Sequence, residues 1–399
     1  MNGPIRTTEQ SVTIYDSKEA YEGYTLFAPH YGRDLWLIDM KGRVVHHWKM
    51  EHLPGGDGRL LPNGNLLRLN KTLTEPLHFL GSVSSELVEV DWEGNTVWKH
   101  EDPYLHHDFF RLDNGNTLLN RHVLVPKEMV PKIKGGIPGT ELKEGMWDNG
   151  FQEITPVGKV VWEWLGYQHQ DPEVDVICPL CARTIWNYAN GVYPTPEGGI
   201  IESCRHFNTI SIVDRKTGKI TWRWGSPYEL GHHHNPSLLK NGNILVFDNG
   251  FHRQTTHEVA DENYSRVIEI NPKTDRIEWE YKDKNPQNFY SGICSSAERL
   301  PNGNTFICES SKGRLFEVTP DHEIVWEFFN PFYFEWGRLG LTNLVFKAHR
   351  YGGEFEGFKG KKLEPRKFEW VLKEEEKTVS EGKEKQEEAV RRRLKKLGY

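Results

Sequence analysis

Histidine and arginine gather in a few short segments of this 399-residue chain. Each segment lies next to an apolar, strand-like run, and together they are His106-His107-Asp108, Trp186-Asn187-Tyr188-Ala189-Asn190, Arg205-His206, His232-His233-His234-Asn235, His252-Arg253 and Tyr290-Ser291. A neutral imidazole can act as a nucleophile, a proton carrier or a metal ligand, and a guanidinium binds oxyanions. Cationic and hydrogen-bond-donating groups outnumber carboxylates in these segments. They therefore predict a site for an anionic small molecule such as a sulfate or phosphate ester.

Metal binding is a second chemistry that these residue types allow. His107, His206 and His234 come from three different repeats of the chain, and imidazoles around an open position suit copper, iron or zinc. Cys178-Pro179-Leu180-Cys181 is half of a zinc site, a redox pair or a loop pair without chemistry. A closed zinc site there would take its remaining ligands from His169 or from the histidines of the central segments.

The elements that must position these residues repeat at intervals of roughly 50 to 60 residues, which indicates an array of one structural unit. Six strand-like segments that carry or end in aromatic residues recur at 44–48, 96–100, 160–164, 220–224, 276–281 and 323–328. Asn-Gly, or a degenerate form of it, recurs at 62–65, 113–116, 196–199, 240–243 and 301–304. Asn-Gly between apolar runs is a strong hairpin signal. Each repeat thus supplies four strands: A before this turn, B after it, C, and D with the tryptophans.

Four-stranded repeats of this kind are typical of the blades of a β-propeller. Residues 24–28 resemble a strand B without a strand A, and residues 343–351 resemble a strand A without B, C and D. We therefore predict an all-β, six-bladed β-propeller in which the N- and C-terminal strands complete one blade. The B–C loops and the D-to-A connections of such a fold lie on one face, and they carry most of the 18 histidines. This asymmetry predicts a histidine-lined funnel at one mouth of the central channel.

The tryptophans of the D strands are expected to pack between neighbouring blades, because large aromatic side chains contribute strongly to such contacts. If Trp98 and Trp222 are buried, replacing either of them by alanine would destabilise the fold by about 3 to 5 kcal/mol.

Composition limits the domain organisation and the classes of function. We predict one propeller domain over residues 1–355 and a charged, mostly helical extension over 356–399, which is a solvated tail or a helix for homo-oligomer formation. A net charge of −7 with interspersed signs argues against a nucleic-acid partner. No apolar run is long enough to span a membrane, and residues 1–13 do not resemble a signal peptide. Five cysteines, an odd number, favour a reducing compartment, so we expect a cytoplasmic protein.

At these motifs the chain resembles the arylsulfotransferase family, in particular its group of six-bladed propellers. The resemblance covers most of residues 85–351 and rests on His106-His107-Asp108, Ser203-Cys204-Arg205-His206-Phe207-Asn208-Thr209, 213–219 with Trp222-Arg223-Trp224-Gly225, His234-Asn235-Pro236, 247–250, 299–309 and Lys347-Ala348-His349-Arg350-Tyr351. It implies an enzyme that transfers a sulfuryl group from an aryl sulfate to a phenol through a histidine that carries the sulfate, with no cofactor. It also implies that His107, His234 and Arg253 are active-site positions.

The candidate site residues follow from the segments and the resemblance together. Catalytic candidates are His107, His206, His234 and Arg253, and candidates for binding a small aromatic or anionic substrate are His106, Tyr188, Asn190, Arg205, His233, His252 and Tyr290. Residues 290–296 contain no histidine where the sulfate-carrying residue is expected, and Tyr188 stands where many relatives have histidine. Two alternatives therefore stay open: a metal-dependent enzyme with copper, iron or zinc on His107, His206 and His234, and a propeller that binds a ligand without catalysis.

Overall fold

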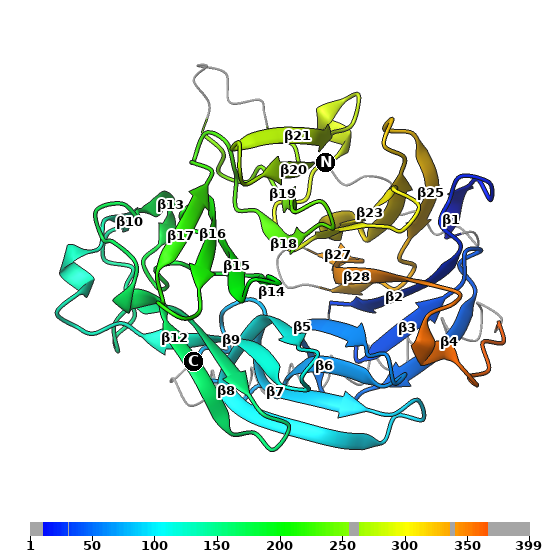
Figure 1. The fold of residues 1–399 in the computed structure, drawn as a ribbon, viewed down its shortest axis with the longest axis horizontal. Coiled ribbons are helices and arrows are strands. Elements are labelled where there is room, and N and C mark those ends of the chain that lie inside the picture. The colour runs from blue at the N-terminus through cyan, green and yellow to red at the C-terminus, as the bar shows by residue number, and fades with distance from the viewer. Residues whose placement is uncertain (1–10, 31, 255–262, 336–339, 366–399) are drawn as a thin grey trace.

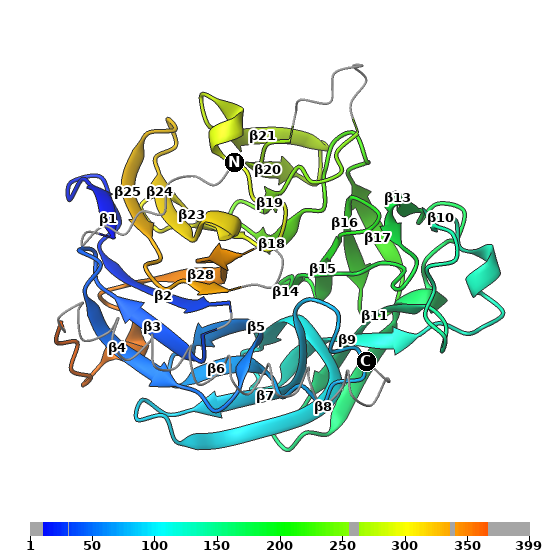
Figure 2. The same ribbon diagram turned by 180° about the vertical axis from the view of Figure 1, so that it is seen from behind.

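The computed structural model describes residues 11–30, 32–254, 263–335 and 340–365, and within these ranges the chain consists of β-strands, short 3-10 helices and loops. The sheets are arranged around a common centre, where β5, β14, β18 and β28 lie innermost (Figures 1 and 2). The expected all-β, propeller-like architecture is thus confirmed. Of the predicted extension over 356–399, residues 366–399 lie outside the described ranges, and the described part holds the 3-10 helix η6 (Glu356–Phe358).

Five sheets surround the centre. Three have four strands each: β28 (Val345–Gly352), β2 (Gly23–Pro29), β3 (Asp34–Ile38) and β4 (Val44–Lys49); β14 (Val192–Pro194), β15 (Gly199–Cys204), β16 (Thr209–Asp214) and β17 (Ile220–Trp224); and β18 (His234–Leu238), β19 (Ile244–Asp248), β20 (Arg266–Asn271) and β21 (Arg276–Tyr281). A fourth sheet joins β22 (Ser296–Arg299), β23 (Thr305–Glu309), β24 (Arg314–Val318), β25 (Ile324–Phe329) and β1 (Val12–Tyr15).

The fifth sheet has seven strands because one long strand is shared between two groups. The groups are β5 (Leu53–Leu60), β6 (Leu66–Lys71) and β7 (Val83–Val90) on one side, and β9 (Thr117–Leu124), β11 (Trp147–Ile154) and β12 (Val160–Leu165) on the other. The shared strand, β8 (Thr96–Arg111), pairs with β7 through its first half and with β9 through its second half. Asn-Gly turns join the first two strands of several groups, and Gly64, Gly115, Gly242 and Gly303 all have positive φ there, as the sequence predicts.

The two ends of the chain meet as the sequence predicts. The C-terminal strand β28 pairs antiparallel with the N-terminal strand β2 from Gly23↔Gly352 to Pro29↔Val345, so the ring is closed by hydrogen bonds between chain ends. The extra outer strand β1, which pairs with β25, is not apparent from the sequence, because Val12–Tyr15 is short and two of its four side chains are exposed.

Tryptophans of the outer strands connect neighbouring groups, and this predicted role is confirmed. Seven of the indole N–H groups donate to a backbone carbonyl in the turn between the third and fourth strands of the next group, and Trp222 donates to the Asp275 carboxylate instead. The pairs are Trp48 with Asp91, Trp98 with Pro156, Trp162 with Arg215, Trp164 with Gly218, Trp224 with Asp275, Trp279 with Pro320 and Trp326 with Met40, at N···O distances of 2.6–3.1 Å. The last pair returns from the end of the array to its beginning.

Burial of these tryptophans is uneven, which corrects one expectation. Trp48 and Trp326 are buried, but Trp98 and Trp222 are only half-buried. Their replacement by alanine should therefore cost less than the loss of a fully buried tryptophan. The apolar cores themselves lie between neighbouring sheets; in one of them, Trp36 of β3 packs with Phe306 of β23 and Trp326 of β25. The apolar residues are thus used between the sheets, which leaves polar side chains to line the centre.

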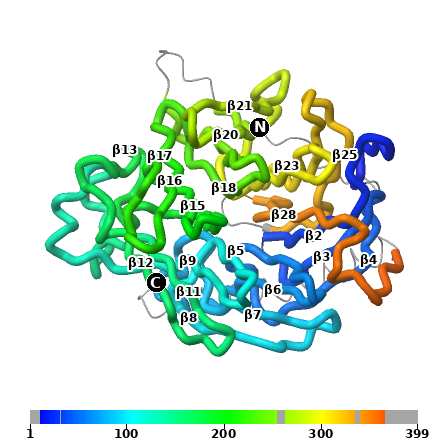
Figure 3. The backbone as a smooth tube through the Cα atoms, in the orientation of Figure 1, coloured from blue at the N-terminus to red at the C-terminus, as the bar shows by residue number. Residues whose placement is uncertain are grey.

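Two long connections carry an additional small sheet. Strand β10 (Gly135–Ile137), from the segment between β9 and β11, pairs in parallel with β13 (Ile177–Ala182), from the segment between β12 and β14. Figure 3 shows this part of the chain at the left edge of the ring, next to the group of β15 to β17. Its core includes Cys178, Cys181 and Trp186. In the described residues, no helix is long and apolar enough to cross a membrane.

Candidate functional site

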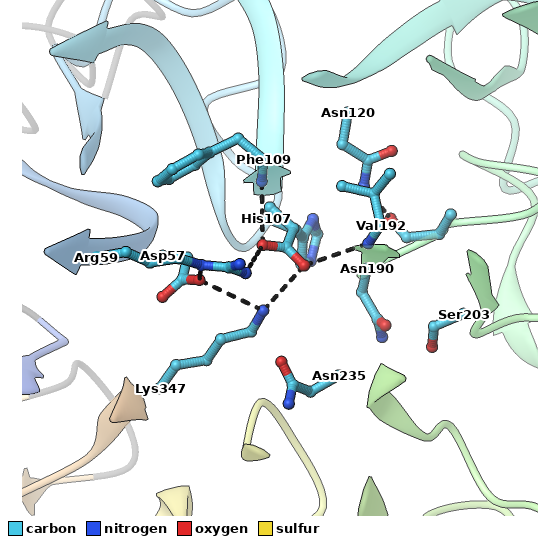
Figure 4. Close-up of polar contacts among 12 residues, drawn as sticks. Asp57, Arg59, His107, Phe109, Asn120, Asn190, Val192, Ser203, Asn235 and Lys347 are labelled. Carbon is cyan, nitrogen blue, oxygen red and sulfur yellow. Dashed lines mark hydrogen bonds and ion pairs between the residues drawn. The ribbon is translucent and has the colours of Figure 1, made fainter. Parts of the chain in front are cut away.

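Buried charged side chains cross the channel between the innermost strands. Lys347 of β28 lies 3.1 Å from Asp108 of β8 and 3.8 Å from Asp57 of β5. Arg59 contacts the same two carboxylates, with its guanidinium 2.6 Å from Asp57 and 2.8 Å from Asp108. Figure 4 shows the Lys347 side chain reaching toward Asp57, with Arg59 beside it. With His349 of β28, which lies 2.7 Å from Asp57, these residues form what we call the ion-paired channel.

Charge pairing fixes the protonation of this channel. Burial alone would favour the neutral form of each group. For His349, burial is opposed by the carboxylates of Asp57 and Glu298, which raise its pKa to about 9. For Asp57, burial is outweighed by His349, Arg59 and Lys347, which hold its pKa well below the usual range. Both groups are therefore ionised at neutral pH.

A cavity of about 280 Å³ lies against this channel, toward the Asn-Gly turns of the innermost strands. Its lining includes Arg59, Asp108, Asn235, Glu298, His349 and Arg350. Sequence reasoning assigned no function to Asp57, Arg59, Lys347 or His349. The signals were that Lys347, His349 and Arg350 stand in a single strand-like run, and that this run is one of the motifs that carry the family resemblance.

The predicted histidine segments meet at the other mouth of the channel, where their rings form a continuous arc. Successive ring centroids are separated by 3.9 Å for His122–His106, 5.0 Å for His106–His107, 5.3 Å for His107–Tyr188, 5.1 Å for Tyr188–His206, 6.1 Å for His206–His232 and 4.7 Å for His232–His252. These rings, with His234 and Arg205, are the histidine mouth. They come from strands β8, β9 and β18 and from loops that the propeller topology brings to the same face.

The backbone is unusual at several of these positions. His107, Tyr188, His232 and His252 have positive φ values of 57°, 55°, 53° and 58°. Residues other than glycine rarely adopt this conformation, and clusters of such residues mark functional sites more often than plain structural ones. Their occurrence in four separate segments around one mouth indicates that the fold holds these rings in defined directions.

Hydrogen bonds set the tautomers of two histidines in the mouth. The Asn249 amide nitrogen donates to the carbonyls of Ser291 and Cys294, at 2.7 Å and 3.0 Å, so its oxygen must face His234. His234 Nδ1 lies 2.8 Å from that oxygen and therefore carries the proton. His206 Nδ1 likewise donates to the Ile185 carbonyl, at 2.9 Å. In both rings the lone pair is left on Nε2, and none of the described residues bonds to Nε2 of His234.

His106, His107, His206 and His234 of the mouth are neutral at physiological pH. Burial, with a further contribution from the charge of Arg205, lowers the pKa of His206 and of His234 to about 3. Burial also lowers the pKa of His106 to about 3, and that of His107 well below its ordinary value. Neutral imidazoles with an available nitrogen are competent nucleophiles, general bases and metal ligands.

The two predicted arginines differ in availability. The Arg205 guanidinium lies 5.4 Å from the ring centre of Tyr188, and no ion pair joins it to a carboxylate of the described residues. Arg253 instead forms an ion pair with Asp248, at 2.7 Å. Arg205 is therefore the better placed of the two to receive an anion.

The remaining predicted residues contribute in different ways. Asn190 and Ser203 both donate to the backbone carbonyl of His233, at 3.0 Å, and so tie β14 and β15 to β18. Figure 4 shows Asn190, Ser203 and Asn235 grouped at the channel. His106 bonds to His107 through their Nδ1 atoms, at 2.9 Å, and its stacking on His122 supports the His107 ring from behind. Tyr290, half-buried, is not part of the ring arc.

One group of potential metal ligands occurs in the described part of the chain. It consists of Cys178, Cys181, His232 and His252, whose ligand atoms all lie within 4.8 Å of one another. His107, His206 and His234 do not form such a group, so the alternative metal centre on these three histidines is not assembled.

Comparison with known proteins identifies the family and the fold. The family model described as "Arylsulfotransferase (ASST)" matches residues 9–328. No protein in the curated collection matches significantly. A solved structure of a protein of unknown function from Bacteroides caccae superposes with a TM-score of 0.54 at 12% identity, over 82% of this chain and 98% of that chain. A streptogramin B lyase structure gives 0.45 at 11% identity over 86% and 95%, and virginiamycin B lyase from Staphylococcus aureus gives 0.44 at 11% over 80% and 83%.

Proposed function

Because the chain belongs to the arylsulfotransferase family, we propose that it is a transferase that moves a sulfuryl group from an aryl sulfate to a phenol in the histidine mouth. The observation that carries this proposal is the state of His234. Its proton sits on Nδ1, bonded to Asn249, and its Nε2 has a lone pair and no partner among the described residues. An imidazole in this state can accept a sulfuryl group without first losing a proton.

The reaction balances with His234 as the carrier. Nε2 attacks the sulfur of the aryl sulfate, an N–S bond forms, and the S–O bond to the aryl group breaks with its electron pair leaving as phenolate. The oxygen of the acceptor phenol then attacks the same sulfur, the N–S bond breaks, and the imidazole recovers its lone pair. A proton passes to the first phenolate and is lost by the acceptor phenol, and His107 is our candidate for carrying it.

Arg205 is our candidate for binding the sulfate oxygens. A guanidinium without a carboxylate partner keeps its donors for an oxyanion, and its planar fork matches two oxygens at once. The Tyr188 ring, which Arg205 overlies, and the neighbouring ring of His107 offer surfaces for an aryl group. His234 would thus replace the histidine that is missing from residues 290–296.

The test is an assay with p-nitrophenyl sulfate as donor and a phenol as acceptor, followed by release of nitrophenolate. After mixing with donor alone, digestion and mass spectrometry should find one sulfuryl group on the peptide that contains His234. His322→Ala, on the opposite face in the turn between β24 and β25, is the matched control and should keep full activity. If the His234→Ala variant folds and turns over aryl sulfate as well as the wild type does, this role is refuted. If the wild-type protein binds aryl sulfates without turnover, it is a binding propeller.

We also infer a six-bladed ring from the same structure. The seven-stranded sheet can be divided into two four-stranded blades that share β8, one through each half of that strand. The tryptophan bonds support this division, since they lead from group to group and return from Trp326 to Met40. We place the end of the propeller near residue 355 and propose that the charged segment after it is a separate extension.

A further inference from the structure

We propose that Cys178, Cys181, His232 and His252 bind one zinc ion in a closed, four-coordinate site beside the histidine mouth. Three parts of the fold contribute ligands: the β13 segment supplies the two thiolates, the connection between β17 and β18 supplies His232, and the loop after β19 supplies His252. The spacing along the chain from Cys181 is 51 residues to His232 and 71 to His252.

The distances between ligand atoms match a tetrahedron around zinc. With Zn–S bonds of about 2.3 Å and Zn–N bonds of about 2.1 Å, tetrahedral angles separate sulfur from nitrogen by about 3.6 Å. Cys178 Sγ lies 3.5 Å from His252 Nδ1, and Cys181 Sγ lies 3.5 Å from His232 Nε2 and 3.8 Å from His252 Nδ1. Three independent sulfur–nitrogen distances thus agree with one central ion.

Hydrogen bonding explains this arrangement less well than a metal does. His252 Nδ1 faces both sulfurs at once, although a ring nitrogen carries at most one proton and can donate well along only one direction. Cys178 and Cys181 form no disulfide in this structure, and their sulfur atoms lie close enough together to bind one ion. Zinc bound to two thiolates and two neutral imidazoles has no net charge, which suits a site whose cysteines and His232 are buried.

The backbone is built to bring these residues together. Gly231 and Gly250 lie in direct backbone contact: a side chain on Gly231 would meet Gly250 at 2.6 Å, and one on Gly250 would meet the Tyr264 carbonyl at 2.0 Å. The Phe251 N–H donates to the Gly231 carbonyl, at 3.1 Å. This close crossing sets His232 and His252 side by side, both with positive φ. The Cys178 N–H donates to the His206 carbonyl, at 2.8 Å, which fixes the cysteine segment against the mouth.

Four protein ligands leave no open coordination position, so the zinc would be structural rather than catalytic. It would hold the β10–β13 sheet against the loops that carry Arg205, His206 and His234. The site does not rest on the proposed sulfuryl transfer, and the two can be tested separately.

The experiment is metal analysis of untagged protein, purified with reductant and without chelator, and again after incubation with zinc and gel filtration. We expect about one zinc per chain. Cys178→Ser/Cys181→Ser should lose the zinc, and His252→Ala should bind it at least 10-fold more weakly. Two matched variants should keep it: Cys294→Ser, a buried cysteine outside the group, and His107→Ala/His234→Ala, which removes the two mouth histidines proposed for catalysis.

Cobalt substitution decides the question even if the double serine variant does not fold. Cobalt(II) in the wild-type protein should give the absorption bands of a tetrahedral thiolate site. A folded, reduced wild-type protein that retains no zinc would overturn the proposal. So would zinc that persists in Cys178→Ser/Cys181→Ser, cobalt bound without thiolate bands, or a Cys178–Cys181 disulfide that forms in the presence of zinc and reductant.

Discussion

The histidine mouth and the ion-paired channel are adjacent regions that share strand β8, yet their buried histidines have opposite charge states. His107 and Asp108 are neighbours in β8 and both are buried, but the first belongs to the mouth and the second to the channel. In the mouth, burial lowers the pKa of His234 to about 3. In the channel, the pKa of His349 is raised to about 9 because Asp57 and Glu298 outweigh its burial.

This difference indicates that neighbouring carboxylates, rather than burial alone, decide whether a buried histidine is charged or neutral, and therefore which role it can take. Burial opposes the charged form of the imidazole in both regions, at His234 as at His349. Among the described residues of the two regions, carboxylates lie at hydrogen-bond distance from a histidine in the channel, where His349 becomes a fixed cation that holds strands together. In the mouth, no carboxylate of the described residues is hydrogen-bonded to a ring, and burial keeps His206 and His234 neutral, as a nucleophile or a metal ligand must be.

The largest expected effect lies in the mouth. His234→Ala should lower kcat for aryl-sulfate turnover by about 10³-fold or more, because removing a nucleophile abolishes the step that depends on it. His349→Gln, in the channel, should change kcat by less than about 10-fold at neutral pH, since that side chain acts on stability and not on the reacting groups. Steady-state assays of both variants check this. Equal losses in the two would show that the regions do not divide catalysis and stability as proposed.

The channel should show its effect in stability. Asp57→Asn removes the carboxylate charge that pairs with His349, Arg59 and Lys347. Breaking a buried ion pair in this way lowers the free energy of unfolding by about 3 to 5 kcal/mol. Urea denaturation measures it. Asp321→Asn, on an exposed turn, is the control and should stay within about 0.5 kcal/mol of the wild type. A loss of less than 1 kcal/mol in Asp57→Asn would mean that the channel is solvated enough to rearrange.

The sequence predicted the histidine mouth better than it predicted the channel, for a physical reason. Repeats and turn signals establish which loops share a face, so His107, Tyr188 and His206 could be placed together before their contacts were known. Ion pairs carry no such local signal: Asp57 and His349 are 292 residues apart in the chain and meet only because the ring closes. Each of them, taken alone, resembles an ordinary polar residue within a strand.

The same limit applies within the mouth. The family resemblance favoured Arg253 over Arg205 as an active-site residue, and the ion pair of Arg253 with Asp248 is visible only in the structure. The Cys178–Cys181 pair was recognised from its spacing, with His169 or the histidines of the central segments as its possible partners. The sequence could not single out His232 and His252, because a crossing of two loops at Gly231 and Gly250 brings them there. Long connections follow tertiary contacts rather than a periodic pattern, so their paths are not readable from residue types.

A pH series should separate the two regions by the sign of their effect on stability. His349 has a folded pKa of about 9, above its unfolded value of about 6.5, so its contribution is complete below pH 6.5 and is lost as the pH rises through 9. The difference corresponds to about 3 kcal/mol. The mouth histidines, with folded pKa values near 3 for His106 and His206, act in the opposite direction: stability is lost as the pH falls below about 6.5.

Thermal unfolding between pH 5 and 10 measures both limbs of this profile. His349→Gln should flatten the alkaline limb and leave the acid limb in place, since glutamine cannot carry the charge that Asp57 and Glu298 stabilise. An alkaline limb that persists unchanged in this variant would show that another group, not His349, is the fixed cation of the channel.

The smallest expected effect concerns the cations of the two regions. Lys347 and Arg59 are each held by two carboxylates, whereas Arg205 pairs with none in the described part of the chain. Arg205→Lys keeps the charge but loses the planar fork, so it should raise KM for an aryl sulfate by about 10-fold, or about 1.4 kcal/mol, with a smaller change in kcat. Arg253→Lys, whose partner is Asp248, should leave KM within about twofold of the wild type. If instead Arg253→Lys raises KM and Arg205→Lys does not, the anion is bound by the arginine that the family resemblance indicated, and Asp248 must release it when substrate arrives.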